Sequence, residues 1–303
     1  MKQGLKDVPT WQGWAAEQSK GGKIVAVDPL LVSAPDAQTL ASQIEKAGGG
    51  ELKALDENLV DLVWGSDRPA RPANPLIIQP AEYSGKTIKE KLVNLREELK
   101  KRKSPGFFVT MLDEVAWLYN LRGTDIPYNP VFYSYASITP TTAALYIDKS
   151  KLDDVSTAQL AEGGVDVKPY EAFLGDVKQL FQEVKGTKQS PDSEPSGKFI
   201  ISNAASWAVQ RALGGEDHVD AIRSPIADVK AVKNEAELEG MRNCHIRDGA
   251  ALIEYFAWLE DQLLNKKATL TEAEAADKLE EIRSKKPLFK GLSFPTISST
   301  GPK

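Results

Sequence analysis

The chain has 303 residues, of which 41% are hydrophobic and 27% charged, with a net charge of −5 and an isoelectric point of about 5.4. This composition is typical of a soluble globular protein of about two ordinary domains. The acidic balance argues against nucleic-acid binding, and no apolar run approaches the ~20 residues that a membrane span needs. The single cysteine, Cys244, and the absence of a signal-peptide pattern favour the cytosol.

The first unit is predicted from the elements before a proline-rich stretch. The apolar run at 23–27 predicts a buried strand. Asp36 is expected to cap a helix over 36–47, which three consecutive glycines then end. Closely spaced prolines within 67–75 indicate a semi-extended linker. We therefore expect residues 1–80 to hold the C-terminal part of a first domain and this linker.

The second unit, residues 81–231, is predicted to be a layered α/β domain because strands and helices alternate along it. It opens with a helix whose capping box is Thr87 and Glu90. Two β-rich runs joined at 140–142 predict a hairpin, and the polar stretch 185–198 is expected to be an exposed loop. The strands are expected at 107–111, 131–138, 143–147, 165–167 and 199–201, and further helices after Asp113 and over 171–184 and 204–213.

The third unit, residues 232–303, is expected to be an incomplete domain. Asn234 and Glu237 form a capping box before a helix of about eight turns, and a second helix begins at Thr271. A strand is expected over 292–300. Two helices and one strand do not bury a core alone, so this unit needs further elements.

Residues that carry chemistry are sparse. His218 lies in a polar loop, and His245 follows Cys244 on the long helix, where adjacent side chains point about 100° apart and cannot act as a nucleophile and base. Metal sites gather histidines, carboxylates or thiolates from several elements, and no such motif is present. Phosphate-binding loops and serine-hydrolase motifs are also missing from the sequence. The residues alone therefore predict no catalytic and no metal-binding residue.

A resemblance to a known family goes further. The chain resembles the long, three-domain, cytosolic eukaryotic aminopeptidase P, a Xaa-Pro aminopeptidase. The similarity covers essentially the whole chain in the right order. The stretches that carry it are MKQGLKD (1–7), DENLVD (56–61), Trp64, DRP (67–69), LDEVAWLYNLRG (112–123), NPVFYSY (129–135), KAVKN (230–234), EGMR (239–242) and SFPTISSTGP (293–302).

The resemblance implies a fold and an activity. Members of this family have two creatinase-like domains and a C-terminal pita-bread domain, and they release an N-terminal residue when proline follows it. Two divalent ions, usually manganese, are held by Asp, His and Glu, and a bridging water attacks the peptide carbonyl. The resemblance places all of these ligands beyond Lys303, so it assigns no catalytic or metal residue here. It places Phe294 at the border of the substrate pocket.

Two functions from different classes stay open. The chain is expected to be a central fragment of a peptidase, inactive alone, whose intact form acts on proline-containing peptides. The alternative is a non-catalytic interaction or dimerisation module derived from the peptidase, since relatives are commonly dimeric. A third interpretation, a metal-free peptide or histone reader with a pita-bread-like fold, is disfavoured because the resemblance is to the peptidase branch.

Overall fold

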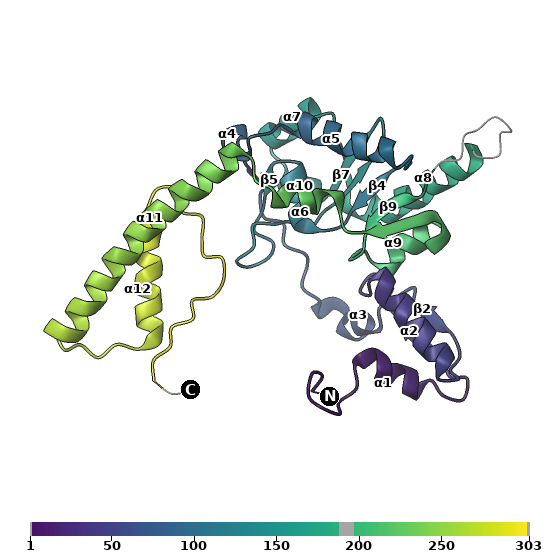
Figure 1. Cartoon of the computed structure of the whole chain (residues 1–303), viewed down its shortest axis with the longest axis horizontal. Coiled ribbons are helices and arrows are strands. Elements are labelled where there is room, and N and C mark those ends of the chain that lie inside the picture. Colours follow the sequence, from purple (N-terminus) through teal and green to yellow (C-terminus); the bar gives the residue numbers. More distant parts are fainter. Residues whose placement is uncertain (1, 188–196, 302–303) are drawn as a thin grey trace.

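The computed structural model describes residues 2–187 and 197–301, which together form an arch (Figure 1). A central α/β domain forms the top of the arch. The N-terminal unit and a pair of long helices near the C-terminus both project from the same side of this domain, and a gap separates them. The figure thus shows a central domain with one further part of the chain projecting from it near each terminus.

The N-terminal unit is a small βαβ arrangement with two further helices. Strands β1 (Val25–Val27) and β2 (Leu52–Ala54) pair in parallel, and helix α2 (Ala34–Lys46) crosses between them. Helices α1 (Trp11–Gln18) and α3 (Leu59–Trp64) flank this pair. The strand and helix predicted in this region are confirmed. The cap is not Asp36: the Ser33 hydroxyl accepts a hydrogen bond from the Asp36 amide, so Asp36 lies in the first turn.

The central domain contains a mixed six-stranded sheet in the order β10-β9-β4-β6-β7-β8. Strands β4 and β6, and β6 and β7, are antiparallel, whereas the other neighbours are parallel. The predicted hairpin is β6–β7. A separate short antiparallel pair, β3–β5, fixes the end of the linker onto this domain. The strands are β3 (Ile77–Ile78), β4 (Phe107–Val109), β5 (Leu121–Arg122), β6 (Tyr135–Ile138), β7 (Ala143–Ile147), β8 (Asp166–Pro169), β9 (Phe199–Ser202) and β10 (Val219–Ile222).

Helices cover both faces of this sheet, which makes a three-layer sandwich. Alternate strand residues face opposite sides, so Phe107 and Val109 pack with α5, whereas Phe108 packs with α8. The two hydrophobic clusters contain most of the buried residues of the chain. The helices are α5 (Ile88–Lys101), α6 (Leu112–Leu118), α7 (Asp154–Glu162) and α10 (Pro225–Ala231) with the first cluster, and α8 (Phe173–Thr187) and α9 (Trp207–Ala212) with the second. The short helix α4 (Ala81–Ser84) contacts α11. The predicted α/β layering is confirmed.

Three details of the central domain differ from the sequence-based expectations. Helix α6 has no side-chain cap, because Asp113 lies in its first turn and pairs with Lys230 instead. The start of the expected loop 185–198 is helical, since α8 extends to Thr187; residues 188–196 lie outside the described part of the chain. Strands β5 and β10 and helices α4, α7 and α10 are not among the predicted elements, although Ser224 followed by proline is an ordinary helix start.

The third unit is a helical hairpin. Helix α11 (Glu235–Glu260) begins at the predicted Asn234–Glu237 capping box and continues into a π-helical turn (Asp261–Asn265). Helix α12 (Glu272–Ser284) begins at the predicted Thr271 cap and packs on α11 through a small cluster of Ala251, Tyr255 and Ile282.

The strand expected over 292–300 is wrong: no strand lies within residues 285–301. The Thr300 amide donates to the Glu272 carboxylate instead of pairing with a strand. An extended segment needs a neighbouring strand to satisfy its backbone, and this one has none.

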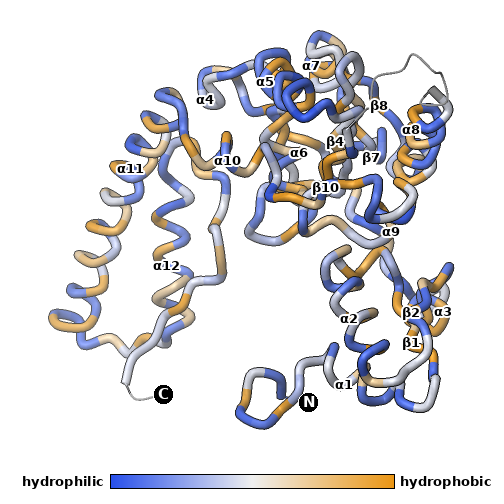
Figure 2. Tube along the Cα trace, turned by 45° about the vertical axis from the view of Figure 1, so that its right-hand side comes forward, coloured by the Kyte–Doolittle hydropathy of each residue, from blue (hydrophilic) through white to orange (hydrophobic). Residues whose placement is uncertain are grey.

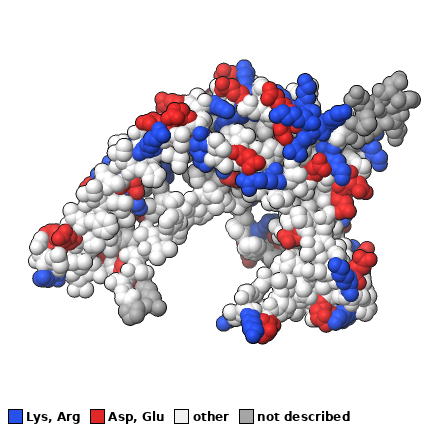
Figure 3. Space-filling view, in the orientation of Figure 1, with Lys and Arg blue, Asp and Glu red and all other residues white. Residues whose placement is uncertain are grey.

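Hydrophobic residues are not confined to the core. Figure 2 shows hydrophobic segments in the sheet and also along α11. On α11, Ile246, Ile253 and Phe256 are all more than half exposed. The space-filling view (Figure 3) shows many Lys, Arg, Asp and Glu side chains over the central domain and large uncharged areas on the two projecting parts. Within the described residues, no helix is long and apolar enough to cross a bilayer.

Candidate functional site

The residues weighed from the sequence do not meet at one site. Phe294 lies in irregular chain after α12 and is 61% exposed. His218 packs against the ring of Phe181 at 4.9 Å, whereas His245 is exposed and its Nδ1 lies 2.8 Å from the Met241 carbonyl oxygen. Over residues 2–187 and 197–301, no group of three or more His, Cys, Asp or Glu could hold a metal ion. These side chains therefore do not fit a two-metal centre.

A cavity of about 590 Å³ lies where the linker crosses the central domain. Arg71 of the linker stacks over Tyr170 at 4.2 Å and pairs with Glu171 at 3.1 Å. The lining residues include no histidine, cysteine, serine or threonine, so the groups that could take part in acid–base or nucleophilic chemistry here are carboxylates, lysines and tyrosines. The cavity therefore lies at the contact between the linker and the central domain.

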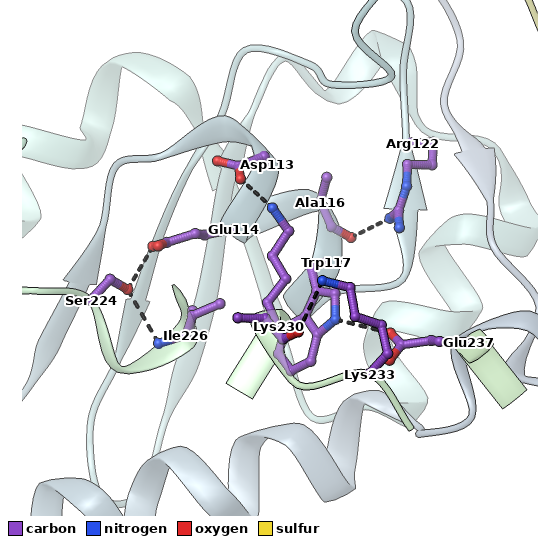
Figure 4. Close-up of polar contacts among 11 residues, drawn as sticks. Asp113, Glu114, Ala116, Trp117, Arg122, Ser224, Ile226, Lys230, Lys233 and Glu237 are labelled. Carbon is purple, nitrogen blue, oxygen red and sulfur yellow. Dashed lines mark hydrogen bonds and ion pairs between the residues drawn. The ribbon is translucent and has the colours of Figure 1, made fainter. Parts of the chain in front are cut away.

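A polar cluster lies where the central domain meets α11, and Figure 4 shows part of it. We call it the junction cluster: Lys91, Asp113, Glu114, Trp117, Asn120, Arg122, Ser224, Lys230, Asn234 and Glu237. Its residues come from α5, α6, β5, α10 and the first turn of α11. Five of them, Asp113 to Arg122, belong to one of the stretches that carry the family resemblance.

One half of the junction cluster joins α6 to α10. Glu114 is only 5% exposed, and its Oε2 accepts a 2.7 Å hydrogen bond from the Ser224 hydroxyl. The same hydroxyl accepts from the Ile226 amide and so caps α10. Burial raises the pKa of Glu114, while the Ser224 hydrogen bond opposes that change. Asp113 pairs with Lys230 at the more exposed edge.

The other half joins the domain to α11. The indole Nε1 of Trp117 donates to Glu237 Oε1 at 3.3 Å, and the second oxygen of Glu237 caps the Asn234 amide. Asn234 Nδ2 in turn donates to the Ser84 carbonyl at 2.9 Å. A side chain at Gly85 would place Cβ 2.3 Å from the Asn234 oxygen, so the close approach requires glycine there.

A lysine lies inside this half of the cluster. Lys91 is 2% exposed, and its Nζ donates to the Trp117 carbonyl at 2.6 Å and to Asn120 Oδ1 at 2.5 Å. Burial lowers the pKa of Lys91 to about 7; Arg122 and Lys86 act in the same direction, and Glu237 opposes them. Burial also lowers the pKa of Arg122, again opposed by Glu237.

The role of the junction cluster is structural: it connects α6 to α10 and the central domain to α11. Its carboxylates and cations contact one another and the backbone, and none of its residues lines any of the three best-formed described cavities. The sequence-based predictions above assign no role to Glu114 or Lys91. The sequence does contain a signal for a buried lysine at this position, because Lys91 occupies the apolar face of α5 between Ile88 and Leu95.

Comparison with known proteins identifies a matching family model and two similar relatives. The family model described as the Creatinase/Prolidase N-terminal domain matches residues 67–237. A probable Xaa-Pro aminopeptidase P of Fusarium vanettenii is 62% identical over 301 residues, which are 99% of this chain and 49% of the relative. The relative of the same name in Metarhizium acridum is 61% identical over 302 residues, with the same shares. The chain spans about half the length of these curated relatives.

A solved structure agrees with both. The crystal structure of X-prolyl aminopeptidase from Caenorhabditis elegans, described as a cytosolic enzyme with a di-nuclear active site, superposes with a TM-score of 0.89 at 34% identity. The match covers 99% of this chain and 47% of that one, so it includes the N-terminal unit, the central domain and the helical hairpin. The chain therefore belongs to the family of the Creatinase/Prolidase N-terminal domain, and its nearly full-length similarity is to part of the Xaa-Pro aminopeptidases named above.

Proposed function

We propose that this chain forms the non-catalytic front part of a Xaa-Pro aminopeptidase, which releases the first residue of peptides with proline in second position. The observation that carries the proposal is similarity over 99% of the chain, both in sequence and in structure. Two divalent ions, manganese by resemblance, would act in the longer protein. Because the described residues offer no metal-binding group, no catalytic step is assigned to this chain.

The proposed organisation has three parts. Residues 1–80 form the C-terminal part of a first creatinase-like domain with its linker, 81–231 a second such domain, and 232–303 the start of a pita-bread domain. Two observations support this division: the separate hydrophobic clusters of the three parts, and the capping box that starts α11 just after residue 232. Phe294 is proposed to border the substrate pocket of the longer protein, and its 61% exposure leaves the ring available for that contact.

The location and assembly of the protein are part of the same proposal. We infer that the protein works in the cytosol, as the Caenorhabditis elegans enzyme is described to do. Homodimerisation is proposed as well, and the exposed apolar side chains of α11 are compatible with further burial.

The test compares two proteins. The first is this chain alone, and the second is a chimera in which residues 1–303 replace the matched region of the Fusarium vanettenii relative. Both are assayed for release of arginine from Arg-Pro-Pro with added manganese, and manganese binding is measured by calorimetry. We expect no turnover and no binding for the chain alone, and turnover for the chimera.

Two outcomes would contradict the proposal. Turnover by the chain alone would mean that its own carboxylates form a metal site. An inactive chimera that is folded and binds manganese, beside an active unaltered relative, would mean that this chain cannot act as the front part of such an enzyme.

A further inference from the structure

Two cationic side chains of the central domain, Lys91 and Arg122, lie near the first turn of α11. Among the described residues, neither pairs with a carboxylate of the central domain. Lys91 Nζ donates to the Trp117 carbonyl and to Asn120 Oδ1 and lies 4.1 Å from the centre of the Trp117 ring, and Arg122 Nη1 donates to the carbonyls of Ala116 and Leu121 at 3.0 and 2.8 Å. Carbonyl and amide oxygens satisfy the donors but do not neutralise the charges. The positive charge at this end of the central domain is therefore uncompensated within the domain itself.

The compensating charge comes from the third unit. Glu237 is the one carboxylate whose charge acts favourably on both Lys91 and Arg122. It occupies position N3 of α11, where its two oxygens bond Trp117 Nε1 and the Asn234 amide. A single side chain thus joins the start of α11 to the domain by hydrogen bonds and by charge (Figure 4).

We propose that Glu237, the buried Lys91 and the half-buried Arg122 form an electrostatic latch that fixes the direction in which α11 leaves the central domain. Helix α11 is 26 residues long, which by the rise of ~1.5 Å per residue is about 39 Å. A small rotation at its first turn therefore becomes a displacement of several ångströms at its far end. The inference rests on the junction itself and does not depend on peptidase activity.

The latch responds to pH through Lys91. The charged groups that face Lys91 are Arg122 from β5, Glu237 from α11, and Lys86 before α5. With a pKa of about 7, Lys91 is charged in mildly acidic solution and neutral in alkaline solution. Because Arg122 keeps its charge, raising the pH weakens the latch without abolishing it.

The chain offers a direct way to test this. Its single cysteine, Cys244, is exposed on α11. Glu97→Cys adds a second exposed cysteine on α5 of the central domain. Spin labels on the two positions report the distribution of distances between α11 and the domain. Glu237→Gln removes the charge and keeps an amide oxygen that can accept from Trp117 Nε1. Glu239→Gln is the matched control, since Glu239 is an exposed acid of the same helix that pairs only with Arg242 and Asn243.

We expect a narrow distribution at about pH 6 that broadens roughly twofold at about pH 9 in the protein with Glu237 intact, because Lys91, with a pKa of about 7, loses its charge in this range. Glu237→Gln should be broad at both pH values, and Glu239→Gln should behave like the parent. An unchanged circular dichroism spectrum shows that each variant is folded. A folded Glu237→Gln variant with the parent's narrow, pH-dependent distribution would overturn the proposal.

Discussion

Replacing Lys91 by methionine should change how the stability of the chain depends on pH. Lys91 is 2% exposed and its pKa is lowered to about 7 from an ordinary value of 10.5. Methionine has a similar length and no charge, so it removes the titration while filling most of the space. It also removes the donor to Asn120 and Trp117, which lowers stability by a pH-independent amount.

The sign follows from proton binding. Between about pH 7 and pH 10 the unfolded chain holds a proton on Lys91 and the folded chain does not. The free energy of unfolding therefore rises with pH in this range, by at most about 1.4 kcal/mol per pH unit from this one group. From about pH 6 to about pH 9, Lys91 contributes a gain of about 2 to 3 kcal/mol that the Lys91→Met variant lacks.

Urea titrations of both proteins at about pH 6, pH 7.5 and pH 9, followed by circular dichroism, give this difference. Contributions from all other titrating groups cancel because they are common to the two proteins. We expect the parent to gain stability relative to Lys91→Met as the pH rises. Parallel pH profiles for the two proteins, with equal slopes against urea, would show that Lys91 titrates in the folded state as it does in the unfolded chain, and would refute the reasoning.

Two further predictions concern other parts of the structure. Ser224→Ala should lower the free energy of unfolding by about 2 kcal/mol, because it removes both the hydrogen bond to buried Glu114 and the cap of α10; Ser206→Ala is the control, since Ser206 precedes α9 without a capping bond, and equal melting temperatures for the two variants would contradict the prediction. Amide hydrogens in the middle of α11 and α12 should exchange much faster than those in β4 and β9, because three buried residues hold the helices together, whereas the sheet is covered on both faces. Uniformly slow exchange across both regions would disagree with this.

The sequence predicted those elements whose cause is local. The starts of α5, α11 and α12 were located correctly because in each case a side chain three residues along bonds back to the cap, and Thr87, Asn234 and Thr271 each do so. The β6–β7 hairpin was also predictable, since its turn and its two strands are adjacent in the chain. The error at Asp36 had a local cause too: Ser33 lies before Ala34 and Pro35, and it is the better cap.

Elements that depend on distant partners were not predictable. The apolar run over 292–300 has the composition of a strand, but only a neighbouring strand could make it one, and none is present in the described chain. The junction cluster is a stronger case. Trp117 and Glu237 are 120 residues apart in the sequence, as the hydrogen bond between them spans that separation, and Glu114 and Ser224 are 110 apart. No periodicity or motif reports such a pair.

Lys91 brings two effects of opposite sign together at this junction. Raising the pH removes a buried charge from the central domain, which stabilises that domain, and at the same time removes part of the attraction that holds Glu237 of α11. The domain therefore becomes more stable while its connection to the third unit becomes looser. A hydrophobic residue at position 91 would give the first benefit at every pH but would leave only Arg122 to attract Glu237. A buried lysine at this position thus lowers the stability of the central domain taken alone. Its contribution is the attraction between the domain and Glu237 of the third unit.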